Sequence, residues 1–230
     1  MKYKCIFFDL DHTLWDYETN SRDTLKELFE RHKLKDKGIN QFGEFHATFK
    51  QVNQELWFLY DHGKIDSAVI RKQRFRKIFE ALDINDMELA TLLSQEYIKE
   101  SPKKGKLMPG AHDTLRHLAG AYPLTVVTNG FNDIQHIKLT SGELTQYFRH
   151  VVTSEKAGFK KPAREIFDFA LAANGVSAGE AVMIGDNLLT DIAGAHNASV
   201  DAVFFNPGRV KHQATVTHEI SSLNELCSFL

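Results

Sequence analysis

Short apolar runs alternate with helical patterns along most of this chain, and this alternation restricts its fold more than any other feature. The runs span residues 4–10, 124–128, 150–153, 181–184 and 202–205. Apolar residues at helical spacing mark the segments between them, at 111–119, 133–139, 162–173 and 191–197. Short buried strands that alternate with helices are typical of a parallel sheet covered on both faces. The sequence therefore predicts an α/β fold, a Rossmann-like three-layer sandwich with at least five parallel strands.

A long helical stretch interrupts this alternation directly after the first run. Between Asp16 and Glu100 apolar residues recur at helical spacing and no strand is indicated, so we expect four helices there. Residues 101–106 resemble a linker that returns to the sheet. We expect an α/β core built from 1–15 and 105–230, with an inserted α-helical cap domain over 16–104.

Two local signals refine the predicted helices. Pro162 fits the first position of its helix, where a missing N–H costs nothing. The run Ser222-Leu223-Asn224-Glu225 has the spacing of a capping box that opens a terminal helix.

Composition narrows the classes of partner and the compartment. With 43% hydrophobic residues and a net charge of −2 over 230 residues, the chain has no basic excess that would favour nucleic acid. We find no signal peptide and no apolar stretch long enough to cross a bilayer, which argues against a membrane partner. Two cysteines, Cys5 and Cys227, argue against a disulfide framework and favour the cytoplasm. The sequence leaves the oligomeric state open, and a monomer is compatible with it.

Four polar clusters follow the predicted strands of the core. They are Asp9 with Asp11, Thr128-Asn129-Gly130, Lys160-Lys161-Pro162, and the run from Gly185-Asp186 to Asp191. In open α/β sheets ligands bind at the carboxyl ends of the strands, where these clusters are expected to meet. Two acids as close as Asp9 and Asp11 oppose each other's ionisation unless a cation neutralises them. The pair therefore indicates a metal, a proton-transfer role, or both.

The residue types in these clusters suit a phosphate group. A hydroxyl, an amide and free N–H groups before a helix, as in Thr128-Asn129-Gly130, form a phosphate cradle. A lysine before the next helix supplies a cation for a phosphoryl oxygen. Oxygen-only ligands of this kind suit Mg²⁺. The eleven histidines show no metal-binding spacing, and we assign none of them to a metal.

Taken in order, the four clusters resemble the signature of the haloacid dehalogenase superfamily: DxDxT, a Ser or Thr after the second core strand, a Lys, and GDxxxxD. The likeness covers nearly the whole chain, because the helical insert occupies the position of that superfamily's cap. One cluster alone would be a weak signal, whereas four on successive strand ends are a strong one. Within the superfamily the chain is most similar to pyrimidine 5′-nucleotidases, in Val52–Trp57 with Tyr60 and Gly63, in Thr128–Phe131, and in Ser154–Gly158.

This resemblance implies a phosphomonoester hydrolase that acts through an aspartyl-phosphate. Asp9 resembles the nucleophile, and Asp11 resembles the general acid that later activates water. Mg²⁺ would be held by the Asp9 carboxylate, the Asp11 backbone carbonyl and Asp186. The implied substrate is a small phosphomonoester, a nucleoside 5′-monophosphate with a pyrimidine or modified base.

The same resemblance assigns the phosphate-binding and supporting groups. Thr128 and the Asn129 backbone would hold the phosphoryl group, and Lys161 would pair with it and with Asp9. We prefer Lys161 to Lys160 because the family's lysine immediately precedes the proline. Asp191 would support the metal from outside its ligand set or orient Lys161.

Residues of the cap region are candidates for a nucleobase slot. Five side chains could line it, although aromatic residues at helical spacing more often belong to a core: Trp15, Asn20, Asn53, Trp57 and Tyr60.

Several alternatives stay open. Asp11 argues against a dehalogenase, because a leaving halide needs no proton, and no Schiff-base lysine of a phosphonatase can be identified. A phosphatase or phosphomutase for a sugar phosphate or other small metabolite would use the same core residues. A non-catalytic phosphoaspartate receiver or binding protein is a rival from another class, to which Asp11 is not suited, and a catalytically dead scaffold is the third.

Overall fold

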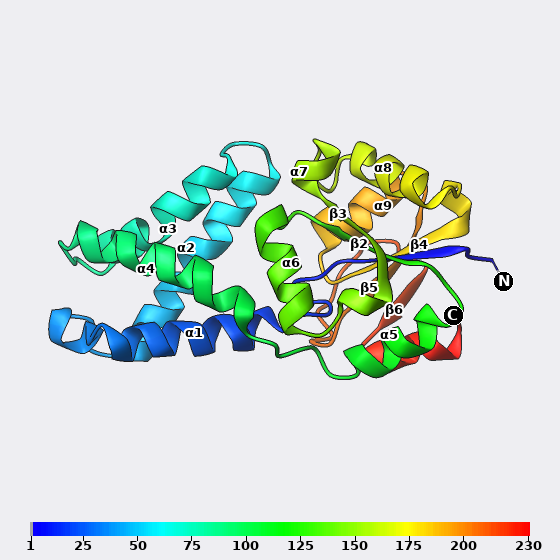
Figure 1. Cartoon of the computed structure of the whole chain (residues 1–230). Helices are drawn as coiled ribbons and strands as arrows, with labels where there is room; N and C mark the ends of the chain where they lie inside the picture. The colour runs from blue at the N-terminus through cyan, green and yellow to red at the C-terminus, as the bar shows by residue number, and fades with distance from the viewer. Residues whose placement is uncertain (1) are drawn as a thin grey trace. The chain divides into compact units, whose positions relative to one another are not determined.

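The computed structural model describes residues 2–230, which form two compact units (Figure 1). One unit comprises the N-terminal segment up to Tyr17 together with Gly105–Leu230, and the other comprises Glu18–Lys104. The contacts therefore divide the chain at 17/18 and 104/105, whereas the sequence placed the first division at 15/16. No helix of the described part is both long and apolar enough to span a membrane.

The first unit contains a six-stranded parallel sheet with the strand order β3-β2-β1-β4-β5-β6. Its strands are β1 Cys5–Phe8, β2 Leu124–Thr128, β3 Phe148–Thr153, β4 Ala181–Gly185, β5 Asp201–Phe205 and β6 His218–Ile220. The α/β prediction is confirmed. The strand β6 was not predicted, because its three residues alternate too briefly to stand out from the preceding polar loop.

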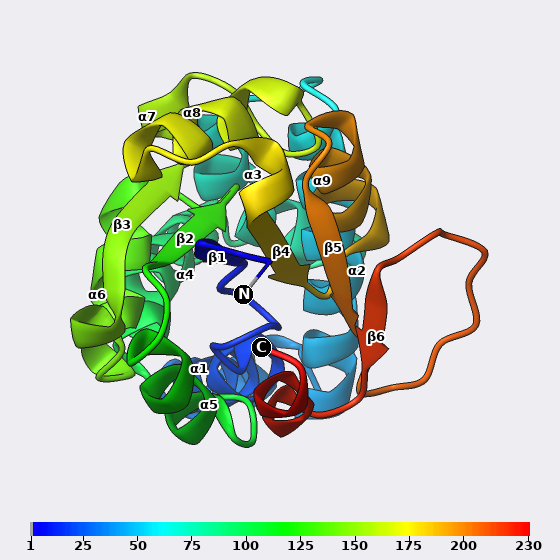
Figure 2. The same ribbon diagram turned by 90° about the vertical axis from the view of Figure 1, so that its right-hand side faces the viewer.

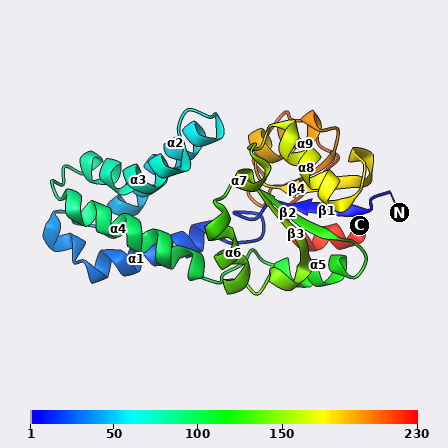
Figure 3. The ribbon, with the colours of Figure 1, turned by 45° about the horizontal axis from the view of Figure 1, so that its top comes forward.

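Helices cover both faces of this sheet, as Figures 2 and 3 show. They are α5 Ala111–Ala119, α6 Asn132–Ser141, α7 Ser154–Ala157, α8 Arg164–Asn174 and α9 Ala193–Asn197. Ile6 and Phe8 of β1 pack in one core with residues of α5, whereas Cys5 and Phe7 pack in the other with residues of α8 and α9. Successive strand residues point to opposite faces, so the unbroken apolar run of β1 fills both cores.

The register of the central strands brings the predicted clusters to one edge. β1 pairs with both β2 and β4, and Phe8 lies opposite Val126 on one side and Ile184 on the other. Because all three strands are parallel, the residues that follow Phe8, Val126 and Ile184 emerge together at their carboxyl ends.

The second unit is helical. It contains α1 Tyr17–Arg31, α2 Phe42–Asp61, α3 Ser67–Ala81, α4 Met87–Glu100 and the 3₁₀ helices Leu34–Lys37 and Ser101–Lys103. The side chains of Asp66 and Asp86 accept hydrogen bonds from Val69 and Leu89, both at 3.0 Å, and so cap α3 and α4. The four predicted helices are present.

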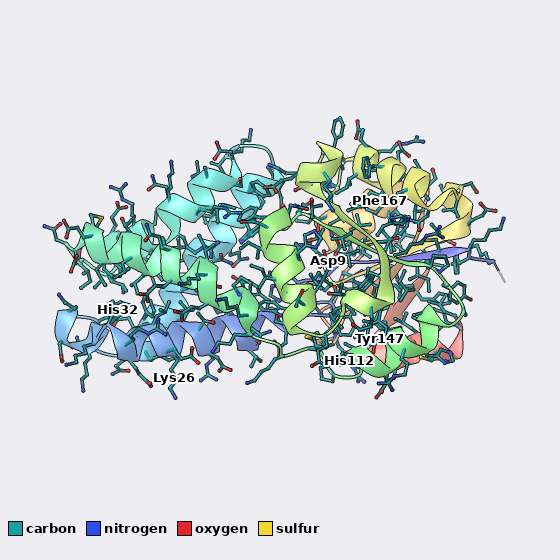
Figure 4. All side chains as sticks on the ribbon, in the orientation of Figure 1. Asp9, Lys26, His32, His112, Tyr147 and Phe167 are labelled. Carbon is teal, nitrogen blue, oxygen red and sulfur yellow. The ribbon has the colours of Figure 1, made fainter. Side chains whose placement is uncertain are left out.

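Aromatic contacts and ion pairs join these helices. Phe49 of α2 and Phe75 of α3 both pack on Tyr97 of α4, with ring centroids 5.1 and 5.7 Å away. Arg31, the last residue of α1, and the labelled His32 that follows it (Figure 4) contact Glu96 of α4 at 3.0 and 2.8 Å. Aromatic packing thus joins α2, α3 and α4, and ion pairs join the end of α1 to α4.

Two details of the predicted helices were wrong or need adjustment. The helix after the lysine pair begins at Arg164, not at Pro162, because the backbone of Ala163 is extended and the Lys161 N–H and C=O are bonded to the side chain of Asn129. Asp191 lies in a π-helical turn, Leu188–Ile192, ahead of α9. The capping box of Ser222 and Glu225 is present, and it opens a 3₁₀ helix, Leu223–Ser228.

Candidate active site

Lys161 lies at the centre of the site. Its ammonium nitrogen donates to Oδ1 of Asp9 at 2.5 Å, to Oδ1 of Asp191 at 2.6 Å and to the carbonyl oxygen of Val127 at 2.8 Å. Burial opposes the charge of this side chain, which is 2% exposed, but the two carboxylates outweigh it and raise the pKa of Lys161. Lys161 is therefore a fixed cation whose three N–H bonds are all used.

Three carboxylates surround this lysine. One carboxylate oxygen from each of Asp9, Asp186 and Asp191 lies within 4.8 Å of the other two. Burial raises the pKa of Asp9 well above its ordinary value, against the pull of Lys161, and the charges of Asp191 and Asp186 add to the rise. Burial, with the charge of Asp191 second, raises the pKa of Asp186 to about 6. One lysine leaves this group with excess negative charge, which a divalent cation would neutralise, and its oxygen-only donors fit Mg²⁺.

The loop after β4 fixes two of these acids. Thr13 donates a hydrogen bond to Asp186 at 3.0 Å, and Asp191 accepts one from the Asn187 N–H at 3.0 Å. A Cβ at Gly185 would lie 2.2 Å from an oxygen of Asp191, so only glycine allows the strand to end so close to this carboxylate. The close approach of the Asp191 carboxylate to the end of β4 explains why a glycine stands at position 185, directly before Asp186.

The loop after β2 forms another wall. Thr128, 2% exposed, accepts a hydrogen bond from the Gly130 N–H at 3.0 Å, which leaves its own hydroxyl hydrogen free to rotate toward another acceptor. Asn129 accepts from the Lys161 N–H at 2.7 Å and donates to the Lys161 carbonyl at 2.9 Å. This two-point contact ties the Thr128 loop to the lysine segment.

Asp11 is held by a residue that sequence reasoning missed. The ammonium of Lys138 on α6 contacts both carboxylate oxygens of Asp11, at 2.6 and 2.7 Å, and Gln135 donates to one of them at 3.4 Å. Lys138 is 6% exposed, and its nitrogen lies 4.5 Å from the ring centroid of Trp15. A signal existed, since Gln135 and Lys138 occupy i and i+3 beside Leu139 on the buried face of α6, where apolar residues are the rule.

The structure brings the predicted core residues to one edge of the sheet. Asp9, labelled in Figure 4, follows β1. Hydrogen bonds or the carboxylate cluster connect it to Lys161, Asp186 and Asp191, and through Lys161 to Asn129. Asp11 lies two residues beyond Asp9 on the same segment, with its carboxylate toward α6.

The candidates for a nucleobase slot come from both units. Trp15 belongs to the core of the α/β unit and is fully buried, and Asn20 on α1 has no exposed surface either, so a contact of these two with a base stays a prediction. Both positions face a core, as aromatic and helical spacing commonly implies. On α2, Trp57 packs edge-on against the buried Tyr60 with ring centroids 5.4 Å apart, and Asn53 stays partly exposed.

The comparisons with known proteins agree with this geometry. Residues 6–205 match the family of haloacid dehalogenase-like hydrolases. The chain is 31% identical to the pyrimidine 5′-nucleotidase PynA of Streptococcus pneumoniae, over 100% of this chain and 96% of that protein. It is 30% identical to the pyrimidine 5′-nucleotidase YjjG of Escherichia coli, over 98% and 97% of the two chains.

A solved structure shows the same fold. The HAD-hydrolase YfnB of Bacillus subtilis, whose crystal structure was determined bound to magnesium, is 29% identical and superposes with a TM-score of 0.88 over 98% of this chain and 97% of that one. The match over most of the chain, the full-length relatives and the residues at the sheet edge together show that this protein belongs to the haloacid dehalogenase-like hydrolase family.

Proposed function

We propose that this protein is a Mg²⁺-dependent phosphatase that hydrolyses nucleoside 5′-monophosphates with a pyrimidine or modified base, through an aspartyl-phosphate. The observation that carries the proposal is the Asp9 carboxylate at the end of β1, held by the buried Lys161 beside Asp186 and Asp191. A carboxylate held in one position next to a fixed cation is suited to attack an anionic phosphoryl group. The two full-length nucleotidase relatives support the substrate class.

In this mechanism each group has a defined role. Asp9 attacks phosphorus and forms an acyl phosphate while the ester oxygen leaves. Asp11 gives its proton to that oxygen and then takes one from the water that hydrolyses the acyl phosphate. Thr128 and the Asn129 N–H hold the phosphoryl oxygens as their charge redistributes, and the positive charge of Lys161 attracts these oxygens.

The carboxylates of Asp9 and Asp186 and the backbone carbonyl of Asp11 would hold Mg²⁺. When bound, the ion neutralises the anionic phosphate and the carboxylate that attacks it. Asp191 would act by fixing Lys161, which it contacts at 2.6 Å.

Binding of Mg²⁺ should depend on pH, because ion and proton compete for Asp186. The pKa of Asp186 is about 6 in the folded chain, against 3.8 ordinarily. In the absence of metal, the protonated Asp186 therefore contributes stability below pH 4, and this contribution is lost as the pH rises through about 6. The increase in Tm caused by Mg²⁺ should therefore grow between pH 5 and pH 7, because at pH 5 the ion must displace a proton from Asp186 and at pH 7 that carboxylate is already ionised. Thermal melts with Mg²⁺ and with chelator test this. An equal Mg²⁺ shift at every pH, or one unchanged in Asp186→Asn, would contradict it.

Lys138 should matter most for esters whose leaving group needs a proton. Replacing it by Met removes the anchor of both Asp11 oxygens. We expect kcat/KM, which reports the steps up to formation of the acyl phosphate, to fall by about 10- to 100-fold for a nucleoside monophosphate, with a smaller loss for p-nitrophenyl phosphate, whose leaving group departs without a proton. Steady-state kinetics on both substrates check this. Equal losses on the two would show that Lys138 does not act through Asp11.

A phosphatase for sugar phosphates or other small metabolites is the alternative, because the phosphate-binding residues contact no part of the alcohol. Phosphate release from a panel of nucleoside monophosphates and sugar phosphates, with Mg²⁺ and with chelator, separates the two. The proposal expects metal-dependent turnover led by pyrimidine nucleotides. Turnover led by a sugar phosphate would overturn the substrate assignment, and a long-lived phosphoenzyme without turnover would favour a receiver.

A further inference from the structure

A buried amide beside Asp11 is bonded on one side and unpaired on the other. Gln135 of α6 is 1% exposed, and its Nε2 donates to Oδ2 of Asp11 at 3.4 Å. Its Oε1 is buried and has no hydrogen-bond partner among residues 2–230. Buried polar groups in folded proteins are nearly always hydrogen-bonded, so an amide with an unpaired oxygen reduces stability. A residue that is unfavourable for the fold at its own position points to a role in function.

The orientation of this amide follows from the carboxylate that it faces. The amide nitrogen only donates, the amide oxygen only accepts, and an ionised carboxylate only accepts. Turning the amide over would place Oε1 against Oδ2 of Asp11, with two acceptors in contact. Gln135 therefore bonds to Asp11 only with its oxygen turned away, where the described residues offer no donor. The hydrogen bond is long, as those of catalytic groups often are before substrate binds.

The loop Thr128-Asn129-Gly130 keeps this amide in place. A Cβ at Gly130 would lie 1.7, 2.5 and 3.1 Å from Nε2, Cδ and Cγ of Gln135, which are its three nearest atoms. The backbone of Gly130 is not left-handed, so the space that Gln135 takes is what excludes a side chain there. The Gly130 N–H in turn donates to Thr128 at 3.0 Å. Gln135 thus lies between the loop that would hold the phosphoryl group and the carboxylate of Asp11.

Gln135 also makes the two oxygens of Asp11 unequal. Lys138 contacts Oδ1 and Oδ2 at 2.6 and 2.7 Å, so it holds the carboxylate without distinguishing between its oxygens. Gln135 donates to Oδ2 alone. Each carboxylate oxygen has two lone pairs, so these contacts use both lone pairs of Oδ2 and one of Oδ1. The oxygen that can still exchange a proton with substrate or water is Oδ1.

We propose that Gln135 is a positioning residue that turns the Asp11 carboxylate so that Oδ1 transfers the proton. Oδ1 gives its proton to the ester oxygen as the P–O bond breaks, and it takes one back from the water that attacks the acyl phosphate. This inference rests on the proposed phosphatase function and adds to it the residue that orients the general acid.

Replacing Gln135 by Met keeps the length of the side chain and removes both polar groups of the amide. We expect kcat/KM for uridine 5′-monophosphate to fall by about tenfold, and kcat/KM for p-nitrophenyl phosphate to stay within about twofold of wild type, because its leaving group needs no proton. The Tm should stay the same or rise, because the unpaired oxygen is gone. Gln146→Met, at an exposed position, is the matched control and should change none of these values. A lower Tm with equal losses on the two substrates would show that Gln135 only fills space, and would overturn the inference.

Gly130→Ala displaces the same amide by another route. Its Cβ would occupy the place of Gln135 Nε2, so kcat/KM for uridine 5′-monophosphate should fall again, with a smaller loss for p-nitrophenyl phosphate. The double variant Gly130→Ala, Gln135→Ala frees that space, and its loss should equal the loss of Gln135→Ala alone. Losses that multiply would contradict the inference.

The choice of substrates distinguishes a failure of this inference from a failure of the proposed function. A wild-type protein that hydrolyses no phosphomonoester would reject both. If the wild type prefers a sugar phosphate, only the substrate assignment fails, and ribose 5-phosphate then serves as the alkyl ester in the same comparison. Equal losses on the alkyl and the aryl ester in Gln135→Met would reject the role of Gln135 and leave the phosphatase activity established.

Discussion

Replacing Asp9 by Asn is expected to abolish phosphate release from every phosphomonoester, with a loss of more than about 10³-fold. The amide has the shape of the carboxylate but cannot attack phosphorus. The fold should survive, because burial already disfavours the charge of Asp9 and Lys161 keeps Asp191 and the Val127 carbonyl as acceptors. Phosphate release at saturating Mg²⁺, with the Tm of the same sample, measures both effects.

An exposed acid provides the control for that substitution. Asp113 of α5 has a side chain that is 77% exposed, and Asp113→Asn should leave turnover unchanged. Activity retained in Asp9→Asn would assign the chemistry to another group.

Replacing Lys161 by Met should both inactivate and destabilise the protein. The methionine fits the space but leaves Asp9 and Asp191 buried without their shared cation. Breaking a buried ion pair from one side costs about 3–5 kcal/mol. For a chain of this size each kcal/mol corresponds to roughly 2–4 °C, so we expect the Tm to fall by about 10 °C.

The neighbouring lysine is the matched control for Lys161. Lys160 is partly exposed, whereas Lys161 is buried between the two carboxylates, so Lys160→Met should change the Tm by less than about 2 °C and leave activity near wild type. The assignment of the family's lysine to Lys161 would be wrong if the two variants behaved alike or in the reverse order.

The arrangement of the sheet edge could be predicted because it depends on local patterns. Each acid or lysine follows an apolar run, and parallel strands bring their carboxyl ends together whatever the intervening sequence. Asp9, Thr128 and Asp186 could each be identified once the strand before them had been assigned. Lys161 needed one more clue, the proline beside it.

Lys138 could not be identified in the same way, because it contacts Asp11 from the buried face of α6. A lysine or arginine within a helix is usually exposed, and the sequence does not show which face packs inward when that face carries polar residues. The contacts of Lys138 with Asp11 join residues far apart in the chain, and they follow from how α6 packs on the core. Trp15 shows the limit of the same reasoning from the other side, since the sequence does not reveal that this aromatic residue near the motif packs in the core.

The proposed mechanism requires that Asp9 becomes phosphorylated during turnover, and acid-quench mass spectrometry detects that phosphoryl group. Asp11→Asn should slow hydrolysis of the acyl phosphate, whereas p-nitrophenyl phosphate can still donate its phosphoryl group because its leaving group needs no proton. We predict that the quenched Asp11→Asn protein carries one phosphoryl group on the peptide that contains Asp9, and that the Asp9→Asn, Asp11→Asn double variant carries none. A phosphoryl group on any other residue, or one that persists in the double variant, would contradict the account.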